Sequence, residues 1–215
     1  MMPDLTVAFV DLAGFTALTE VHGDEDAADL VERFVEISRQ ALEPPDRLVK
    51  SLGDAVMLTS LHPAGGIALI RRLYDAFGQE INFPLPRAGL HHGSVVERGG
   101  DFFGSTVNTA ARVAAQASAG SVLATPPVAK VARGLGISVF DLGLIRLRNV
   151  EEPLELSELD IGERSDAYSI DPVCRMRVEH DVAVGRLGFE GHSFWFCSMA
   201  CASKFASEPA RYAEV

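Results

Sequence analysis

Three short segments of the chain hold six polar residues whose types could together bind a nucleoside triphosphate. The segments read FVDLAGFTALTE, VKSLGDAVML and GGDFFGSTVNTAARV. They supply two carboxylates for divalent metal, a donor and an acceptor for the edge of a base, an amide and a guanidinium. The residues are Asp11, Lys50, Asp54, Asp101, Asn108 and Arg112. Such a set could turn a sugar hydroxyl onto the phosphate of the same nucleotide.

Asp11 and Asp54 are the candidate metal ligands. Asp11 lies in the hydrophobic run TVAFVDL (6–12), which predicts a mostly buried strand, and Asp54 follows Gly53 in a pair that suits a tight hairpin. Antiparallel neighbours could bring both carboxylates together, where oxygen ligands can hold Mg²⁺ or Mn²⁺. The plainer alternative is a strand end and an ordinary turn residue.

Lys50 and Asp101 are the candidate base readers. Adenine presents an acceptor at its ring N1 and a donor at its exocyclic amine, which match a Lys donor and an Asp acceptor. Guanine reverses this pattern, so the pair should reject GTP by leaving buried polar groups unpaired. The alternative for Asp101 is a turn residue beside Gly99-Gly100.

Asn108 and Arg112 lie four residues apart on a predicted helix and therefore on one face. The apolar neighbours Val107, Ala111 and Ala114 can pack while the two polar groups reach a ligand. A solvated helix face is the alternative.

The segment Ala13-Gly14-Phe15-Thr16 predicts a turn that enters a helix. Backbone amides at such a turn can bind phosphate oxygens without using a cation. A plain loop is the alternative at each of these positions.

Hydrophobic periodicity predicts the elements that must position these residues. Helices are expected over 24–42, 66–78, about 104–117 and after Pro126-Pro127. Strands are expected at 6–12, on both sides of Gly53-Asp54, through RAGLHHGSVVER and SVLAT, and near 138–142, 144–148 and 153–159. The order βαββαβ plus extra strands indicates an α+β fold with a ferredoxin-like core and helices on one face of the sheet. This domain is expected to span 1–160, followed by a polar linker at 161–169.

Composition restricts the class of partner. A chain of 215 residues can hold one medium domain and a small one, and its net charge of −11 argues against nucleic acid, which requires clustered Lys and Arg. MMPDLTVAFVDL has an acid where a signal peptide has basic residues. No stretch approaches the roughly 20 apolar residues of a membrane helix. We therefore expect a cytoplasmic protein that does not bind a membrane.

The remaining histidines carry no catalytic pattern. No partner lies at catalytic spacing from His22, His62, His91 or His92, and each is expected on a loop or strand surface. The sequence shows no Ser-His-Asp order and no Walker-type GxxxxGK, which argues against acyl transfer and P-loop chemistry.

From Ile170 onward the chain predicts a small second domain, at 170–215, that contains all three cysteines. Cys174, Cys197 and Cys201 have the spacing C-x22-C-x3-C. A helix beginning after Ser198 would aim two of the sulfurs the same way, and Cys174 could complete a thiolate trio for Zn²⁺ or another soft metal. His192 or water are the candidates for a fourth ligand. A regulatory metal, a structural zinc and a Cys-lined core without metal all remain open.

Two known families share these motifs. Over roughly residues 4–160, the three segments resemble the catalytic domain of class III adenylate and guanylate cyclases. From Ile170 to Ala213 the chain resembles the YHS domain, a small module related to metal-binding, zinc-ribbon-like folds, through DPVC, GHS, FCS and the closing F…P…Y.

The cyclase resemblance implies roles for individual residues. Asp11, Asp54 and the Leu12 carbonyl would hold two Mg²⁺ or Mn²⁺ ions per site. Asn108 would orient the ribose, and Arg112 would stabilise charge on the phosphates. The family usually has Lys-Gly at a final phosphate-binding position. This chain has LRN there, so Arg148 is expected to take that role.

The resemblance also implies an activity. Guanylate cyclases carry Glu and Cys at the places of Lys50 and Asp101, so the expected reaction converts ATP to cyclic AMP and pyrophosphate. In this family each site forms between two subunits, so a homodimer with two sites is expected. The tail is a candidate for regulation by metal or redox state. The alternatives are a catalytically weak nucleotide-binding signalling module and a metal-binding adaptor whose cyclase-like domain serves dimerisation.

Overall fold

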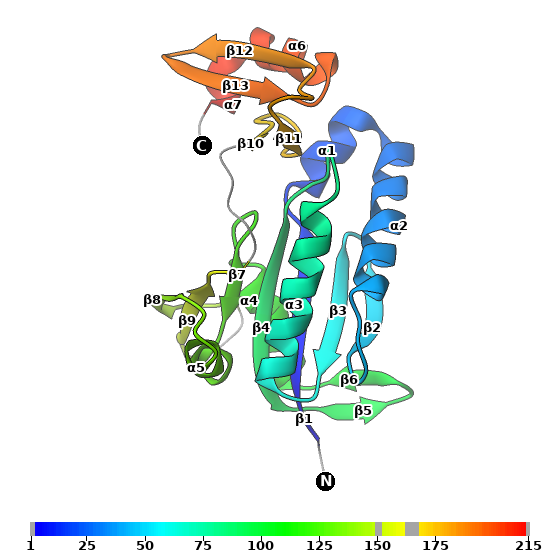
Figure 1. Ribbon diagram of the computed structural model, residues 1–215, viewed down its shortest axis with the longest axis vertical. Helices are drawn as coiled ribbons and strands as arrows, with labels where there is room; N and C mark the ends of the chain where they lie inside the picture. Colours follow the sequence, from blue (N-terminus) through cyan, green and yellow to red (C-terminus); the bar gives the residue numbers. More distant parts are fainter. Residues whose placement is uncertain (1–2, 149–151, 162–167, 214–215) are drawn as a thin grey trace.

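The computed structural model describes residues 3–148, 152–161 and 168–213. A seven-stranded sheet in the order β2-β3-β1-β4-β7-β9-β8 forms its centre (Figure 1). The strands are β1 (Asp4–Leu12), β2 (Arg47–Leu52), β3 (Ala55–Ser60), β4 (Pro86–Ser94), β7 (Val122–Ala124), β8 (Val139–Ile145) and β9 (Leu154–Leu159). β4 and β7 run parallel, and the other neighbours run antiparallel. The β2-β3-β1-β4 part confirms the expected ferredoxin-like core.

Helices cover both faces of this sheet. They are α1 (Phe15–His22), α2 (Asp24–Gln40), α3 (Pro63–Gly78), α4 (Ser105–Ala114) and α5 (Pro126–Gly134). α2, α3 and α5 pack on one face with the larger core cluster, whereas α4 packs on the opposite face. Helices on a single face were expected, so the position of α4 corrects that prediction. The expected helix over 66–78 begins three residues earlier, because Pro63 occupies the first helical turn.

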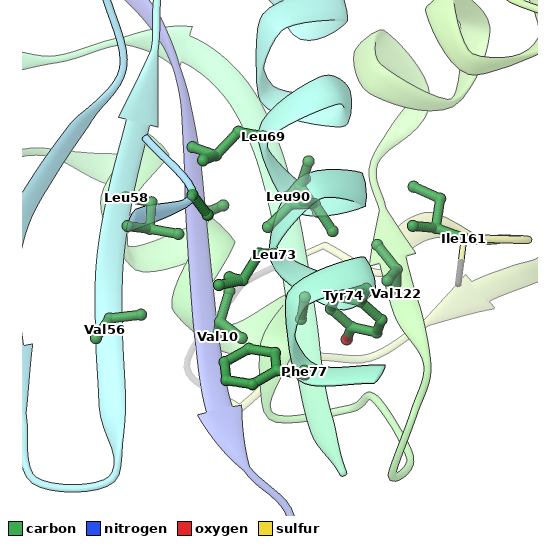
Figure 2. Close-up of a cluster of buried hydrophobic side chains, with 14 of the residues drawn as sticks. Val10, Val56, Leu58, Leu69, Leu73, Tyr74, Phe77, Leu90, Val122 and Ile161 are labelled. Atoms are coloured by element: carbon green, nitrogen blue, oxygen red, sulfur yellow. The ribbon is translucent and has the colours of Figure 1, made fainter. Parts of the chain in front are cut away.

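The alternation of side chains along β1 decides which way the site residues face. Ala8 and Val10 pack with α3, and Figure 2 shows Val10 beside Leu73 and Phe77. Phe9, between them, packs on the opposite face with α4. Because side chains alternate along a strand, Asp11 shares the face of Phe9. The strand therefore carries its carboxylate to the side of the sheet that α4 covers.

The β2–β3 hairpin has the tight turn that its sequence predicts. Leu52 pairs with Ala55, and Gly53 adopts a left-handed φ of 62° that glycine accepts readily. A register shift between Leu48 and Lys50 leaves an extra residue in β2 and places Lys50 opposite Met57. Met57 packs in the cluster on the α4 face. The bulge thus aims Lys50 at the same side of the sheet as Asp11.

One part of the strand prediction was wrong. The two strands expected near 138–142 and 144–148 form the single strand β8, with a register shift between Asp141 and Gly143. Gly143 has φ 75°, so the chain kinks there without leaving the sheet. The linker expected at 161–169 falls mostly outside the described residues, so the domain boundaries stay predictions.

The tail consists of two hairpins and two short helices. They are β10 (Tyr168–Ile170), β11 (Arg177–Glu179), β12 (Gly185–Phe189), β13 (His192–Phe196), α6 (Met199–Ser207) and α7 (Pro209–Tyr212). Leu18 and Ala27 of the first domain share one core cluster with Phe196 and Phe205 of the tail. In Figure 1 the tail lies beside α1 at one end of the molecule. The two domains therefore pack together through apolar side chains.

A buried arginine also attaches the tail to the first domain. Arg177 is a residue only 6% exposed, and its guanidinium donates hydrogen bonds to the carbonyls of Phe77 and Gly78 at the end of α3 and of Glu80 just after it. Its backbone N–H donates to the carbonyl of Phe83 at 3.2 Å. Cations favour a helix C-terminus, so this contact stabilises both elements. None of the helices in the described ranges is both long and apolar enough to cross a membrane.

Candidate functional site

Asp11 and Asp54 lie at the same end of the sheet. Asp11 pairs with Ala55 across β1 and β3, and the Leu12 N–H donates to the Asp54 carbonyl at 3.1 Å. Burial raises the pKa of the Asp54 carboxyl, and the negative charge of Asp11 raises it further. Two carboxylates that repel each other in this way form a suitable oxygen donor set for a divalent cation. The Leu12 side chain is buried in the core, so only its backbone could face this site.

Arg87 is a neighbour that the sequence analysis missed. It lies opposite Asp11 on β4, and its Nε and Nη2 donate to the two carboxylate oxygens at 2.5 and 3.0 Å. The hydrogen bond with Asp11 raises the pKa of Arg87. The pairing depends on the register of β1 and β4, which a lone arginine in a strand does not reveal. This arginine orients the Asp11 carboxylate and offsets its charge.

The predicted phosphate-binding turn is the start of α1. Gly14 precedes the helix with a left-handed φ of 78°, and no side chain caps the first turn. Gly14 and Thr16 are exposed, whereas Phe15 packs between the two domains. The first amides of a helix have no partner within the helix, so they are free to meet an anion here.

Lys50 and Asp101 form a direct ion pair. The Lys50 Nζ lies 2.7 and 3.0 Å from the two carboxylate oxygens of Asp101. Asp101 begins β6 (Asp101–Phe103), which forms a hairpin with β5 (Val96–Arg98). The hydrogen bond from Lys50 lowers the pKa of Asp101. Both side chains remain about one-third exposed, at 33% and 32%, so a ligand can reach them.

Asn108 and Arg112 lie on α4, which covers the side of the sheet that Asp11 shares. Asn108 is exposed, and Arg112 Nη1 donates to the backbone carbonyl of Arg148. This contact brings together the two arginines expected to bind phosphate. Within residues 3–148, 152–161 and 168–213, no hydrogen bond or ion pair joins Asn108 or Arg112 to Asp11 or Asp54.

The three cysteines converge, and a histidine of the first domain joins them. Cys197 Sγ lies 3.4 Å from Cys174 Sγ, 3.7 Å from Cys201 Sγ and 3.6 Å from His22 Nε2. His192, the expected candidate, is exposed on β13 and lies outside this cluster. His22 was expected on the surface, and that expectation was wrong. Its partners come from the far end of the chain, which spacing cannot show.

Two further histidines also differ from the expected surface positions. His91 Nδ1 lies 2.7 Å from Thr125 Oγ1, and His92 Nδ1 lies 3.0 Å from Thr6 Oγ1. Both are partly buried on β4, and burial lowers the pKa of His91. They are structural residues of the sheet.

Two family models match the chain. One is described as the adenylate and guanylate cyclase catalytic domain and matches residues 1–156, and the other, the YHS domain, matches residues 169–215. A pH-sensitive adenylate cyclase of Mycobacterium tuberculosis (strain CDC 1551 / Oshkosh) is 42% identical over 124 residues, which is 58% of this chain and 31% of the relative. An adenylate cyclase of Streptomyces griseus is 37% identical over 125 residues, again 58% and 31%. The chain thus spans about a third of the length of these curated relatives.

Solved structures show the same fold. The adenylyl cyclase CyaB from P. aeruginosa gives a TM-score of 0.65 at 24% identity, covering 77% of this chain and 97% of that one. The guanylate cyclase domain of a Catenaria anguillulae protein gives 0.62 at 17% identity, covering 75% and 98%. The fold is therefore common to cyclases of both bases, and the base must be inferred from individual residues. The chain belongs to the adenylate and guanylate cyclase catalytic domain family, with a YHS domain at its C-terminal end.

Proposed function

We propose that this protein is an adenylate cyclase that converts ATP to cyclic AMP and pyrophosphate. The observation that carries the proposal is the ion pair of Lys50, on the β2–β3 hairpin whose turn holds Asp54, with Asp101 of β6. A base reader and a carboxylate pair on one chain fit a purine nucleotide that lies along this edge. The cytoplasm supplies ATP and keeps the cysteines reduced, so it is the proposed location.

Recognition of adenine needs both members of the ion pair. The Lys50 ammonium can donate to the ring N1, and the Asp101 carboxylate can accept from the exocyclic amine. The ion pair holds each group in place before the base arrives, so little side-chain entropy is lost on binding. Guanine would place its donor against the Lys50 donor and its acceptor against the Asp101 acceptor. Both mismatches disfavour the binding of GTP.

Mg²⁺ or Mn²⁺ would be held by Asp11 and Asp54, with the Leu12 carbonyl as a further ligand. When bound, such ions lower the pKa of the ribose 3′ hydroxyl and neutralise charge on the phosphates. In the reaction the 3′ oxygen forms a bond to the α-phosphorus while the bond from this phosphorus to the bridging oxygen breaks. Pyrophosphate leaves with that oxygen, and the hydroxyl proton passes to solvent. Arg87 keeps the Asp11 carboxylate oriented throughout.

The remaining residues bind the sugar and the phosphates. The uncapped amides after Gly14 can donate to phosphate oxygens, and Arg112 and Arg148 add positive charge. Asn108, exposed on α4, can hydrogen-bond the ribose. A cation placed where negative charge develops lowers the barrier more than one that binds substrate and transition state equally.

Among the described residues no hydrogen bond or ion pair links α4 to the carboxylates, and a site completed by a second chain would account for this. In a two-fold dimer, the carboxylates of one chain would face Asn108 and Arg112 of the other. The exposed apolar residues of β8 support pairing, since Phe140, Leu142 and Leu144 are 53%, 44% and 70% exposed. The prominent cavity, of about 700 Å³, lies between the end of α3 and β10, and none of the predicted site residues lines it.

The test is to incubate the purified chain with ATP or GTP and Mn²⁺ and to identify the cyclic product. Cyclic AMP should form from ATP, and Asp54→Ala should lower the rate by at least about 100-fold. Asp75→Ala, on the outer part of α3, is the matched control and should leave the rate unchanged. Cyclic GMP as the main product would refute the roles of Lys50 and Asp101.

A further inference from the structure

The cluster of His22, Cys174, Cys197 and Cys201 has the dimensions of a tetrahedral metal site. All four ligand atoms lie within 4.8 Å of one another. Zinc bonds of about 2.3 Å to sulfur and about 2.05 Å to nitrogen, at tetrahedral angles, place two sulfurs about 3.8 Å apart and a sulfur and a nitrogen about 3.6 Å apart. The distances from Cys197 are 3.4 and 3.7 Å to the other sulfurs and 3.6 Å to His22 Nε2. The fit needs only small shifts.

The cluster is built into its surroundings. Cys174 and Cys201 are fully buried, and Ser198 Oγ accepts a hydrogen bond from the Cys201 N–H at 3.1 Å. The buried carboxylate of Asp171 accepts hydrogen bonds from the N–H groups of Val173 and Cys197, both at 2.9 Å. One side chain thus fixes both the loop before Cys174 and the end of β13. Such supporting contacts orient the ligands of protein metal sites.

The ligands come from two domains. The cysteines belong to the tail, whereas His22 is the last residue of α1, the helix that starts at the proposed phosphate-binding turn. The other end of α1 also touches the tail, because a Cβ built on Gly14 would lie 2.5 Å from the Cβ of Arg175. Arg175 directly follows the ligand Cys174. One end of this eight-residue helix therefore supplies a cluster residue, and the other end contacts the residue that follows Cys174.

We propose that His22, Cys174, Cys197 and Cys201 bind one Zn²⁺ between the domains, and that its occupancy is coupled to nucleotide binding through α1. Three thiolates and a neutral imidazole suit a soft, tetrahedral cation. A Cys-lined core without metal would not need the His22 imidazole to point at the Cys197 sulfur. The zinc site stands on the geometry alone, and the coupling rests on the proposed function.

The test uses the full chain, stripped of metal under reducing conditions. Co²⁺ is added first, because its visible spectrum reports its coordination, and Zn²⁺ then competes for the site. Wild type should bind one Co²⁺ with the strong bands of a tetrahedral thiolate site. His22→Ala should lose the tetrahedral bands and bind Zn²⁺ at least about 10-fold more weakly. His22→Cys should restore a four-coordinate, all-sulfur spectrum, which excludes misfolding as the cause. His192→Ala, an exposed tail histidine, is the matched control and should match wild type. Equal spectra and affinities for His22→Ala and His192→Ala would overturn the site.

The coupling is tested by measuring the affinity of a non-hydrolysable ATP analogue with and without Zn²⁺. Binding linkage is reciprocal, so zinc should change the analogue Kd, and the analogue the zinc Kd, by one common factor of about 5 or more. If the Kd of the analogue is the same with and without Zn²⁺, the coupling is refuted but the zinc site is not. A chain that binds Co²⁺ at His22 but no analogue refutes the coupling and the proposed function together.

Discussion

The Asp11 carboxylate has two neighbours of opposite charge. Arg87 donates two hydrogen bonds to it, whereas Asp54 raises the electrostatic cost of keeping both acids ionised. Arg87 relieves part of that cost, because its positive charge lowers the pKa of Asp54. A divalent cation would relieve the rest. The proposed cation site therefore carries some cost to the stability of the metal-free chain.

This conflict predicts a stability gain from a mutation that destroys activity. The pKa of Asp54 is raised in the folded chain. Such a carboxyl stabilises the fold at a pH below its unfolded pKa of about 4. This stabilisation is lost as the pH rises through the pKa of the folded state. Ionised Asp54 therefore opposes folding at neutral pH. Asp54→Asn should abolish Mn²⁺-dependent product and raise the Tm of the metal-free protein. The rise should be smaller than the about 2–4 °C that about 1 kcal/mol gives at this size, because solvent screens the charge of this partly exposed side chain.

A second buried acid is the control for that measurement. Asp46, with a side chain 5% exposed, pairs with Arg72 at 2.6 Å. Asp46→Asn removes the attraction, so it should lower the Tm. Thermal melts at pH 7 in the presence of a chelator measure both changes in Tm. A lower Tm for Asp54→Asn would contradict the claim that ionised Asp54 opposes folding.

The ion pair of Lys50 and Asp101 predicts a change in base preference. Asp101→Asn keeps the shape of the side chain but can also present a donor, so it should reduce the preference for ATP over GTP by about 10-fold or more. Glu97→Gln is the matched control, because Glu97 pairs with Arg47 at 3.1 Å on the same hairpin. Competition between the two nucleotides, measured as the ratio of kcat/KM values, decides the outcome. An unchanged ratio in Asp101→Asn would remove this residue from base recognition.

At the scale of elements, local rules predicted most of the framework. The continuous hydrophobic run at 6–12 predicted β1, and Gly53 predicted the β2–β3 hairpin, because a left-handed φ is a local requirement. The helix expected after the turn at 13–16 and the helix expected from Asp24 are α1 and α2, and Gly23 divides them. The two expected strands merged into β8 because Gly143 kinks the strand while its partner β9 continues.

The start of α1 allows a prediction about the contact between the turn and the tail. Gly14→Ala places a Cβ at φ 78° and 2.5 Å from the Cβ of Arg175, so it should cost about 1–2 kcal/mol for the backbone plus a clash. Arg175→Gly removes the clash. The double variant should therefore be less destabilised than the sum of the two single changes, by roughly 0.5–3 kcal/mol. Denaturant unfolding measures this coupling.

Gly23→Ala is the control that separates strain from the clash. Gly23 has φ 92°, and no atom lies within 4 Å of a Cβ built there. Its cost should be backbone strain alone and should not change with Arg175→Gly. Additive costs for Gly14→Ala and Arg175→Gly would show that the turn and the tail are not in energetic contact.

At the scale of the whole molecule, the sequence predicts the chemistry of each part but not their contacts. The motif spacing singled out Asp11, Lys50 and Asp101, and the structure places Lys50 and Asp101 in direct contact. Arg87 and His22 were missed for a common reason. Each becomes meaningful only through a partner distant in the sequence, 76 and 175 residues away. Docking of the tail on α1 is decided by tertiary packing, which no local pattern records.

The proposed dimeric site predicts complementation between two inactive variants. Asp54→Ala removes a carboxylate from the β2–β3 turn, and Arg112→Ala removes the guanidinium from α4. If each site takes these groups from different chains, a mixed dimer has one site with both defects and one intact site. An equal mixture with free exchange of subunits should therefore recover about a quarter of the wild-type activity, because half of the dimers are mixed and each has one working site of two. Cyclic AMP production before and after mixing measures the recovery.

The double variant Asp54→Ala/Arg112→Ala mixed with wild type is the control, because its mixed dimers carry one defect in each site and should be inactive. If the mixture of the single variants stays inactive although the chains exchange, the carboxylates and α4 act within one chain, and the dimeric site is wrong.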